Sequence, residues 1–203
     1  MALLSPGFHR RRPEGEADAG DRLPPGQYLT DGFPVLSAGP TPRIIPASWS
    51  FTVENENGQK TSWSWQEFMD LPQETPTVDI HCVTRWSKFG TSWQGVSLDT
   101  LLENVETDAG YAVFHSHGGY TTNVPLEEIT DGKAWIVHTF DGEPLDPEHG
   151  GPARGLIPHL YFWKSAKWVQ GVRLLDHDDP GFWETAGYHN HGDPWREERY
   201  AWA

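Results

Sequence analysis

The sequence predicts a single mixed α+β domain, and three observations favour that class. The chain has 203 residues, which suffices for one domain with a sizeable core. Its 21 glycines and 17 prolines indicate many turns and few long helices. Short apolar stretches typical of strands alternate irregularly with short capped stretches typical of helices, without a strict β-α-β period or an internal repeat.

The two ends of the chain differ in composition from its middle. Residues 1–22 are charged and poor in apolar side chains, so we expect a disordered tail there and one domain over residues 23–203. The proline-rich stretch 23–46 predicts an extended segment that follows a surface or lines a cleft. The aromatic and charged stretch 176–203 predicts irregular structure packed against the domain.

Regular elements are predicted between these ends. Ser64 followed by Glu67 has the spacing of a capping box and predicts a short helix, and Ser97 predicts the start of another. Alternation of apolar and polar residues, or short apolar runs, predict the strands. They are residues 49–53, which turn into a hairpin at 54–58, and residues 77–83, 111–115, 134–140 and 168–175.

The charge of the chain excludes several kinds of partner. Its 29 acidic residues outnumber 15 basic ones, and a net charge of −14 argues against nucleic acid or an anionic membrane surface. No apolar run is long enough to span a membrane, and one cysteine excludes an internal disulfide. The arginines at 10–12 are followed by acidic residues rather than an apolar stretch, so we expect a cytoplasmic protein.

Cys82 is the first candidate for chemistry. A lone cysteine is often an inert buried side chain, and that interpretation stays open on composition alone. However, no acidic residue lies between His81 and Leu98, whereas Arg85 and Lys88 follow the cysteine closely. Cationic surroundings favour the thiolate, which attacks electrophiles and binds soft or multivalent metals.

A second candidate is the stretch from His149 to Arg173, which contains no acidic residue. It carries Arg154, Lys164 and Lys167 together with glycines that permit close backbone approach. Such donors suit a phosphate, although a solvated basic loop would have the same composition. No Walker or dinucleotide fingerprint is present, so ordinary nucleotide binding is not predicted.

Histidines and aromatic residues supply weaker candidates. The pairs His115/His117 and His189/His191 lack the spacing of known zinc sites, and scattered pocket or surface histidines are the preferred interpretation. Near the C-terminus, Tyr188 follows Trp183 in an aromatic segment. That segment predicts either terminal packing or a pocket wall in which Tyr188 donates a hydrogen bond.

Five stretches in this order resemble the sulfite oxidase superfamily of molybdopterin enzymes, over most of the chain from about Phe33 to Trp195. The Cys82 stretch resembles the strand whose thiolate ligates molybdenum, and Trp93 to Leu98 resembles the W-x-G-V-x-L stretch that follows it. Residues 141–145, 149–154 and 164–168 resemble the N-G-x-P-L, H-G-x-P-x-R and K-S-x-K-W motifs.

The resemblance implies a single mixed-sheet domain of the sulfite oxidase molybdopterin-binding fold and a molybdenum–molybdopterin (Mo-MPT) cofactor. It implies that Cys82 ligates the metal, that Tyr188 lies near its exchangeable oxygen, and that Arg85 contacts an anionic substrate. The residues implied to hold the pterin and its phosphate are His149, Arg154, Ser165, Ala166 and Lys167, then His117 or its neighbour Ser116, and the backbone of Leu36 and Ser37 within the Val35–Pro40 loop.

One departure concerns the substrate. Sulfite-oxidising members carry an arginine five residues after the cysteine, where this chain has Ser87, preceded by Trp86. The C-V-x-x-W-S form is similar to the bacterial branch that contains the periplasmic methionine sulfoxide reductase catalytic subunit. This departure argues against sulfite as the physiological substrate, although Arg85 remains available for an anion contact.

The sequence thus predicts a cytoplasmic molybdenum–pterin oxidoreductase that transfers an oxygen atom to or from a small substrate, an S-oxide, an N-oxide or a sulfur oxyanion. We expect an electron-transfer partner of unknown identity. The alternatives are a non-catalytic module that binds pterin or an anion, and a zinc-dependent hydrolase built on the histidines.

Overall fold

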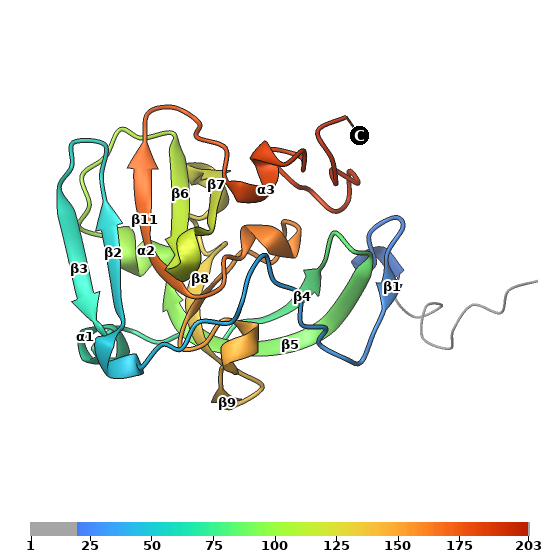
Figure 1. Ribbon diagram of the computed structural model, residues 1–203, viewed down its shortest axis with the longest axis horizontal. Coiled ribbons are helices and arrows are strands. Elements are labelled where there is room, and N and C mark those ends of the chain that lie inside the picture. The colour runs from blue at the N-terminus through green and yellow to red at the C-terminus, as the bar shows by residue number, and fades with distance from the viewer. Residues whose placement is uncertain (1–19, 203) are drawn as a thin grey trace, which may run out of the picture.

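The computed structural model describes residues 20–202. Two mixed sheets form most of the domain, and the short helices lie in the segments that connect their strands (Figure 1). The first sheet has five strands in the order β3-β2-β11-β6-β7, with β2 and β11 parallel and the other neighbours antiparallel. Its strands are β2 (Ser50–Glu54), β3 (Lys60–Ser64), β6 (Tyr111–Ser116), β7 (Thr121–Pro125) and β11 (Val169–Leu175).

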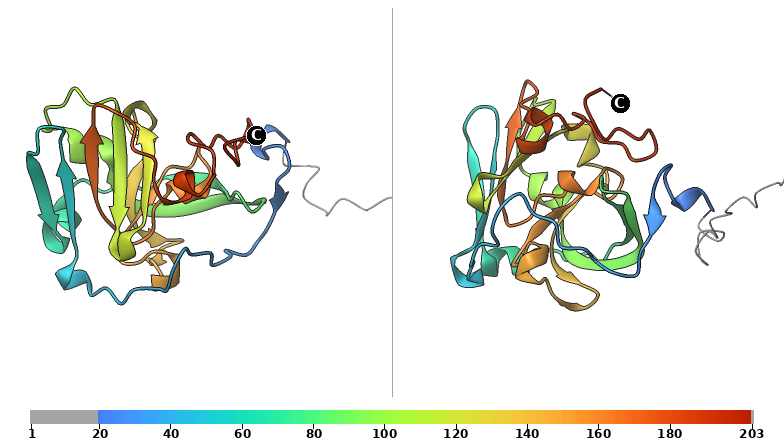
Figure 2. Two further views of the ribbon diagram at one scale, coloured as in Figure 1. Left: turned by 45° about the horizontal axis from the view of Figure 1, so that its top comes forward. Right: turned by 45° about the vertical axis from the view of Figure 1, so that its right-hand side comes forward.

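The second sheet has six strands and curves strongly along its longest one, β5. Strand β5 pairs with β4 and β8 antiparallel and with β1 parallel (Figure 2). Strands β9 and β10 both pair with β8. The strands of this sheet are β1 (Tyr28–Leu29), β4 (Thr77–His81), β5 (Trp86–Ser97), β8 (Trp135–Phe140), β9 (Glu143–Pro144) and β10 (Arg154–Leu156).

Helices are short, as the frequency of glycine and proline predicts. Ser64 caps α1 in a complete capping box with Glu67, and the Ser97 side chain accepts a hydrogen bond from the first turn of α2. The α-helices are α1 (Trp65–Asp70), α2 (Leu98–Leu102) and α3 (Phe182–Thr185). The 3₁₀ helices are η1 (Gly20–Arg22), η2 (Pro46–Ser48), η3 (His117–Gly119), η4 (Leu126–Glu128), η5 (Pro147–His149) and η6 (Phe162–Lys164).

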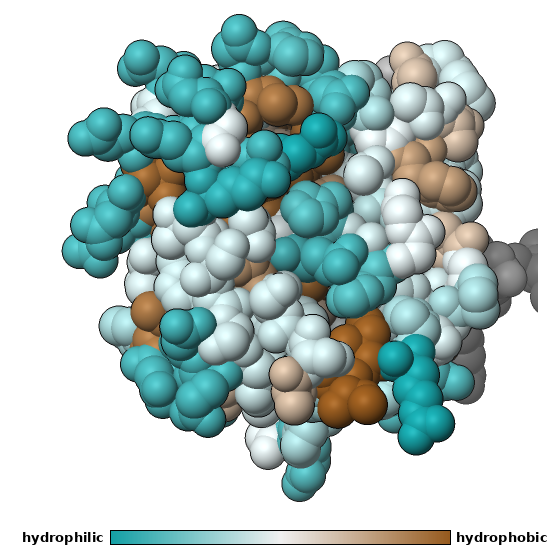
Figure 3. All heavy atoms as spheres, turned by 60° about the vertical axis from the view of Figure 1, so that its left-hand side comes forward, coloured by the Kyte–Doolittle hydropathy of each residue, from teal (hydrophilic) through white to brown (hydrophobic). Residues whose placement is uncertain are grey.

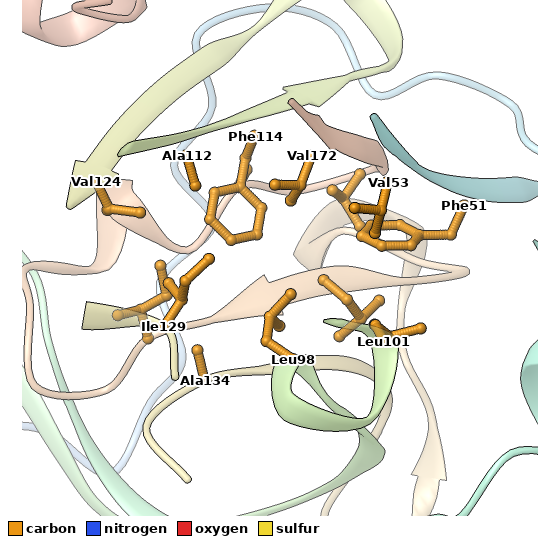
Figure 4. Packing of buried hydrophobic residues seen from close by; sticks show 14 of the residues in the cluster. Phe51, Val53, Leu98, Leu101, Ala112, Phe114, Val124, Ile129, Ala134 and Val172 are labelled. Atoms are coloured by element: carbon orange, nitrogen blue, oxygen red, sulfur yellow. The ribbon is translucent and has the colours of Figure 1, made fainter. Parts of the chain in front are cut away.

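The larger hydrophobic core lies on one face of the five-stranded sheet. Figure 4 shows Leu98 and Leu101 of α2 pointing toward Phe114 and Val172 of the sheet, and all four side chains are at most 1% exposed. The molecular face that Figure 3 shows, on the side of β2 and β3, is mostly hydrophilic with small apolar breaks.

A second core fills the concave side of the six-stranded sheet and includes Cys82. It is unusually aromatic, because Trp86, Trp93, Tyr161 and Trp163 are all buried there. Rings of this size bury large apolar areas, and several of them also line the cavity described below. This core therefore forms the floor of the candidate site.

The predicted fold class is confirmed, and most predicted strands are present with shifts of one or two residues. Strand β4 ends at His81, two residues before the predicted end, because the chain turns at Cys82. The sequence did not predict the twelve-residue strand β5, which contains Gly90 and Gly95. Gly95 is required there, because a Cβ atom would lie 2.1 Å from the carbonyl oxygen of Ile136 on β8.

The predicted tail over residues 1–22 falls largely outside the described residues. At its end, Gly20–Arg22 form η1, and Arg22 makes two hydrogen bonds to the Asp79 carboxylate. In residues 20–202, no helix is long and apolar enough to cross a bilayer.

Candidate functional site

A cavity of about 620 Å³ opens between the curved sheet and the C-terminal segment. Four parts of the chain line it, far apart in the sequence: the strap Phe33–Pro42, the turn after β4, the η3 loop, and the 149–188 region. Figures 1 and 2 show the orange and red C-terminal part of the chain above the green strands β4 and β5. A concave, largely aromatic space with a few polar groups is the usual form of a ligand site.

Cys82 lies in this cavity and is 7% exposed. Its thiol accepts a hydrogen bond from Thr84 Oγ1 at 3.1 Å. Burial raises the pKa of Cys82, and the hydrogen bond and the nearby Arg199 charge oppose that rise only in part. Burial thus favours the neutral thiol, and a thiolate here needs a metal or another positive charge to stabilise it.

The turn that holds Cys82 is tight. The Cys82 amide donates to the Trp86 carbonyl at 2.8 Å, and the Arg85 amide donates to the Cys82 carbonyl at 2.9 Å. Arg85 adopts a φ of 80°, in the left-handed region that few residues other than glycine occupy. This turn directs the Cys82 side chain into the cavity.

Arg154 on β10 is buried in the cavity wall at 1% exposure. Its guanidinium donates to the carbonyl oxygens of His149 and Ser165, both at 2.7 Å, and lies 4.0 Å from the Phe162 ring centroid. Burial lowers the pKa of Arg154 to about 9. No carboxylate among residues 20–202 forms an ion pair with it.

Lys167 adds a second positive charge to the same wall. Its ammonium donates to the Glu148 carbonyl oxygen at 2.6 Å. Burial and the neighbouring Arg154 charge lower the pKa of Lys167 to about 8. Two cations that burial destabilises, without a carboxylate partner in the described chain, make a site that favours an anionic ligand.

His149 lies beside these cations. Its ring stacks on Phe33, with centroids 3.8 Å apart and an interplanar angle of 8°. Its Nδ1 atom is buried and has no hydrogen-bond partner, and burial together with the Arg154 and Lys167 charges lowers its pKa. A neutral imidazole with a free ring nitrogen suits a polar ligand in the cavity.

Most sequence-predicted site residues meet in this cavity. Ten of them contribute to its lining: Leu36, Ser37, Cys82, His117, His149, Arg154, Ser165, Ala166, Lys167 and Tyr188. Arg85 is the exception, because its side chain is exposed and does not line the cavity. Ser116, the alternative to His117, is buried outside the lining.

Two predicted residues have a more specific geometry than the sequence indicated. The Ser165 hydroxyl oxygen accepts a hydrogen bond from the Ile157 amide at 2.9 Å, which fixes its position and leaves its O–H as a donor. Tyr188 stacks on Trp183 at 4.9 Å and contacts Trp163 edge-on at 5.0 Å. These rings form an aromatic wall, which we define as Trp163, Trp183 and Tyr188.

Sequence reasoning did not assign several lining residues to the site. Phe33 and Tyr120 lie in the lining, and so does Trp86, whose Nε1 atom is buried without a partner. Tyr120 shapes the wall by donating to the Trp163 carbonyl oxygen at 2.6 Å. Aromatic residues also fill ordinary cores, so no signal in the sequence distinguished these from core residues.

The histidine pairs do not form a metal centre. Within residues 20–202, no group of three or more His, Cys, Asp or Glu side chains is placed to hold a metal ion. His191 instead bridges two carboxylates, Glu198 at 2.8 Å and Glu128 at 2.9 Å. The zinc hydrolase alternative therefore has no support in the described part of the chain.

The model of the oxidoreductase molybdopterin binding domain family matches residues 38–183, which include most of the cavity lining. The chain belongs to this family of molybdopterin-binding oxidoreductases, and the resemblance noted from its motifs is confirmed.

Two relatives and one solved structure illustrate the range of the family. The uncharacterized oxidoreductase YuiH of Bacillus subtilis is 40% identical over 190 residues, which cover 92% of this chain and 96% of that protein. The protein-methionine-sulfoxide reductase catalytic subunit MsrP of Gluconobacter oxydans is 27% identical over 72% of this chain and 53% of its own length. This chain thus spans nearly all of the first relative but about half of the second.

The sulfane dehydrogenase SoxCD of Paracoccus pantotrophus has a similar fold. The TM-score is 0.60 at 17% identity, over 68% of this chain and 40% of that one. At this identity the similarity concerns the fold, which is the mixed-sheet molybdopterin-binding fold expected from the sequence.

The residues present fit the cofactor that the family implies. Cys82 supplies a soft sulfur donor for a metal, and Arg154 with Lys167 supplies the positive charge that a phosphate compensates. The free Nδ1 of His149 and Nε1 of Trp86 are polar atoms without protein partners at the cavity. Thiol, paired cations and polar ring atoms together match a metal held by a phosphorylated heterocycle.

Proposed function

We propose that this chain is a molybdenum–pterin oxidoreductase that transfers an oxygen atom to or from a small uncharged substrate, an S-oxide or an N-oxide. One observation carries the proposal: the Cys82 thiol and the uncompensated Arg154 and Lys167 side chains line the same cavity. A soft metal ligand beside a phosphate subsite is the pair of features that a metal cofactor bearing a phosphate needs.

Each part of the cofactor has residues to hold it. The Cys82 thiolate would ligate the metal, and Arg154 and Lys167 would bind the phosphate of the pterin. The stacked ring of His149 would donate or accept a hydrogen bond at its free Nδ1, depending on its tautomer. When bound, the cofactor supplies two-electron redox chemistry coupled to transfer of an oxygen atom.

The protein contributes binding, orientation and the exclusion of water. The aromatic wall of Trp163, Trp183 and Tyr188 would exclude water from the substrate side of the cavity. Burial raises the pKa of Tyr188, which keeps its hydroxyl protonated at neutral pH. Tyr188 is therefore a hydrogen-bond donor to a substrate oxygen rather than a base.

The preference for an uncharged substrate follows from where the cations lie. Arg85 is exposed outside the lining, and Ser87 is fully buried with its hydroxyl 2.9 Å from His81 Nδ1. Burial lowers the pKa of His81 to about 4, so this neighbour is neutral as well. Once a phosphate occupies Arg154 and Lys167, no arginine or lysine of the described lining is left for a substrate anion.

The cofactor is tested by analysis of protein purified from a host that makes molybdopterin. We expect about one molybdenum and one pterin per chain, measured by plasma mass spectrometry and by fluorescence of the oxidised pterin. Cys82→Ser should lose most of the metal while retaining pterin, because the phosphate subsite is unchanged. Wild-type protein from a host without the cofactor pathway is the control, and full molybdenum content in Cys82→Ser would contradict the assignment.

The substrate class is tested by steady-state kinetics, with a reduced dye as electron donor for S-oxides and N-oxides and an oxidised dye as electron acceptor for sulfite. We expect kcat/KM for dimethyl sulfoxide or trimethylamine N-oxide to exceed that for sulfite oxidation by roughly 100-fold, about the cost of one missing hydrogen bond to a charged group. A preference for sulfite would contradict the uncharged-substrate proposal and leave the cofactor assignment in place. A loaded protein with no metal reduction by any donor would indicate the non-catalytic alternative. The cytoplasmic location and the electron partner stay predictions.

A further inference from the structure

The turn that presents Cys82 is held from outside by the two ends of the described chain. Strand β1 pairs with the start of β5, and the Tyr28 amide donates to the Arg85 carbonyl at 2.8 Å. Neither the N-terminal contacts at residues 27–30 nor the C-terminal contact at Arg199 falls within the family match at 38–183. These contacts thus lie outside the residues that the family model matches.

Gln27 is the N-terminal contact. It is 8% exposed, and its Nε2 atom lies 3.1 Å from the Cys82 carbonyl oxygen and 2.9 Å from the Trp86 carbonyl oxygen. The same amide is 3.2 Å from Ser87 Oγ. One side-chain amide therefore joins the first and last residues of the Cys82–Trp86 turn.

Arg199 is the C-terminal contact, at 5% exposure. Its Nη1 donates to the Val83 carbonyl oxygen at 2.9 Å, and its Nη2 donates to Gln27 Oε1, also at 2.9 Å. The guanidinium lies 4.9 Å from the Tyr161 ring centroid, which keeps its plane fixed. Gln27 and Arg199 therefore act on the turn as one connected unit.

We infer that Gln27 and Arg199 are positioning residues that fix the Cys82 turn for metal ligation. This deepens the proposed function, because it takes Cys82 as the metal ligand. Groups that hold a ligand from behind restrict its orientation and commonly change metal affinity 10- to 100-fold when removed. Neither residue lines the cavity, so both act on the position of Sγ through the turn alone.

A purely structural role, in which the two contacts only hold the chain ends onto the domain, makes a different prediction. It would lower the midpoint of unfolding but leave the metal's environment unchanged in the protein that remains folded. A positioning role changes the ratio of molybdenum to pterin and the electron paramagnetic resonance (EPR) spectrum of the partly reduced metal. These two readouts separate the roles.

The experiment compares Arg199→Met, Gln27→Met and the double variant in loaded protein. We expect pterin content close to wild type, a molybdenum-to-pterin ratio lowered several-fold, and a shifted EPR spectrum. The molybdenum-to-pterin ratio of the double variant should fall about as far as that of the more severe single variant, because the two residues form one unit. Arg199→Lys should resemble Arg199→Met, since one ammonium does not reproduce the two guanidinium contacts.

Matched controls are available in the chain. Arg196 lies three residues before Arg199 on the same segment, with a side chain 72% exposed, and Gln66 is an exposed glutamine on α1. Arg196→Met and Gln66→Met should match wild type in every readout. Unchanged metal ratio and EPR spectrum in Arg199→Met and Gln27→Met would overturn the inference, as would equal loss of pterin and metal in step with a lower unfolding midpoint.

A cofactor-independent measurement keeps this test separate from that of the proposed function. In cofactor-free protein, we expect the backbone amides of Cys82 and Arg85 to exchange hydrogen about 10-fold faster or more in both variants than in the controls. If wild-type protein holds no molybdenum, the proposed function fails, and fast exchange in the variants alone still shows that they fix the turn. Unchanged exchange at these amides overturns the inference in either case.

Discussion

Lys164 Nζ lies 2.6 Å from Glu184 Oε1, and the two side chains are 0% and 1% exposed. Lys164 also donates to the backbone carbonyls of Asn123 and Asn190, and Glu184 Oε1 accepts from Trp163 Nε1 at 2.8 Å. The pair thus joins α3, which precedes Tyr188, to η6 and β7. The position of the aromatic wall depends on this buried ion pair.

Removal of one member of the Lys164–Glu184 pair should strongly destabilise the fold. We expect Lys164→Met to lower the free energy of unfolding by about 3–5 kcal/mol, because it leaves the Glu184 carboxylate buried without its cation. Urea denaturation measures the change. Lys60→Met, which removes an exposed ion pair with Glu54, should change stability by at most about 1 kcal/mol. A similar loss of unfolding free energy in Lys164→Met and Lys60→Met would contradict the stabilising role of the Lys164–Glu184 pair.

The phosphate subsite should bind a simple anion in cofactor-free protein. Sulfate at about 100-fold above its Kd should stabilise the fold by about 2.7 kcal/mol and raise the midpoint of thermal unfolding by roughly 5–10 °C. Sulfate also stabilises proteins without binding, so the specific effect is the difference from Lys167→Met. Arg173→Met, at an exposed arginine on β11, is the control and should keep the full shift. An equal rise of the unfolding midpoint in wild type, Lys167→Met and Arg173→Met would contradict the assignment of the phosphate subsite.

Sulfate affinity should fall as pH rises through about 8, the pKa to which burial lowers Lys167. Below this pH the ammonium is charged and attracts the anion, and above it the charge is lost. His149 does not add to this change, because burial lowers its pKa and leaves it neutral. Calorimetric titration with sulfate from pH 7 to about 9.5 measures the effect. Lys167→Met should lose the fall near pH 8 and keep only the fall near pH 9, where Arg154, whose pKa burial lowers to about 9, loses its charge.

The lowered pKa of Lys167 also makes the stability of the cofactor-free protein depend on pH, in the direction opposite to that of sulfate affinity. The pKa of Lys167 is lower in the folded state than in the unfolded state, so the unfolded chain binds more protons between about pH 8 and the ordinary lysine value. The contribution of Lys167 to stability therefore rises with pH in that window. Denaturation of wild type and Lys167→Met at several pH values would reveal this difference.

Gly95 should tolerate no side chain. A Cβ atom would lie 2.1 Å from the Ile136 carbonyl oxygen and 2.6 Å from Val137 Cα, and both are backbone atoms that have little freedom to move. We expect Gly95→Ala to destabilise the fold by about 3 kcal/mol, at the upper end for overpacking. Gly110→Ala, where a Cβ meets nothing within 4 Å, should fold normally. Thermal unfolding of both variants tests this.

The sequence by itself determined the fold class, the capped helices and most of the strands. These features depend on interactions between residues close in the chain, such as Ser64 with Glu67, or on periodic burial of one strand face. Its motifs also named ten residues that prove to line one cavity. The order of the motifs was enough to name these residues, because each motif is a short continuous stretch of the chain whose conformation is set locally.

The tertiary structure alone decided how the cysteine is held and which charges face the cavity. Strand β5 is stabilised by pairing with three other strands, and its local sequence does not show that. Arg85 follows Cys82 by three residues, yet a left-handed turn leaves it outside the cavity. Gln27 and Arg199 are 172 residues apart and meet only because both chain ends fold against the same turn. Contacts of such long range have no signal in spacing, since they form only when the whole chain is packed.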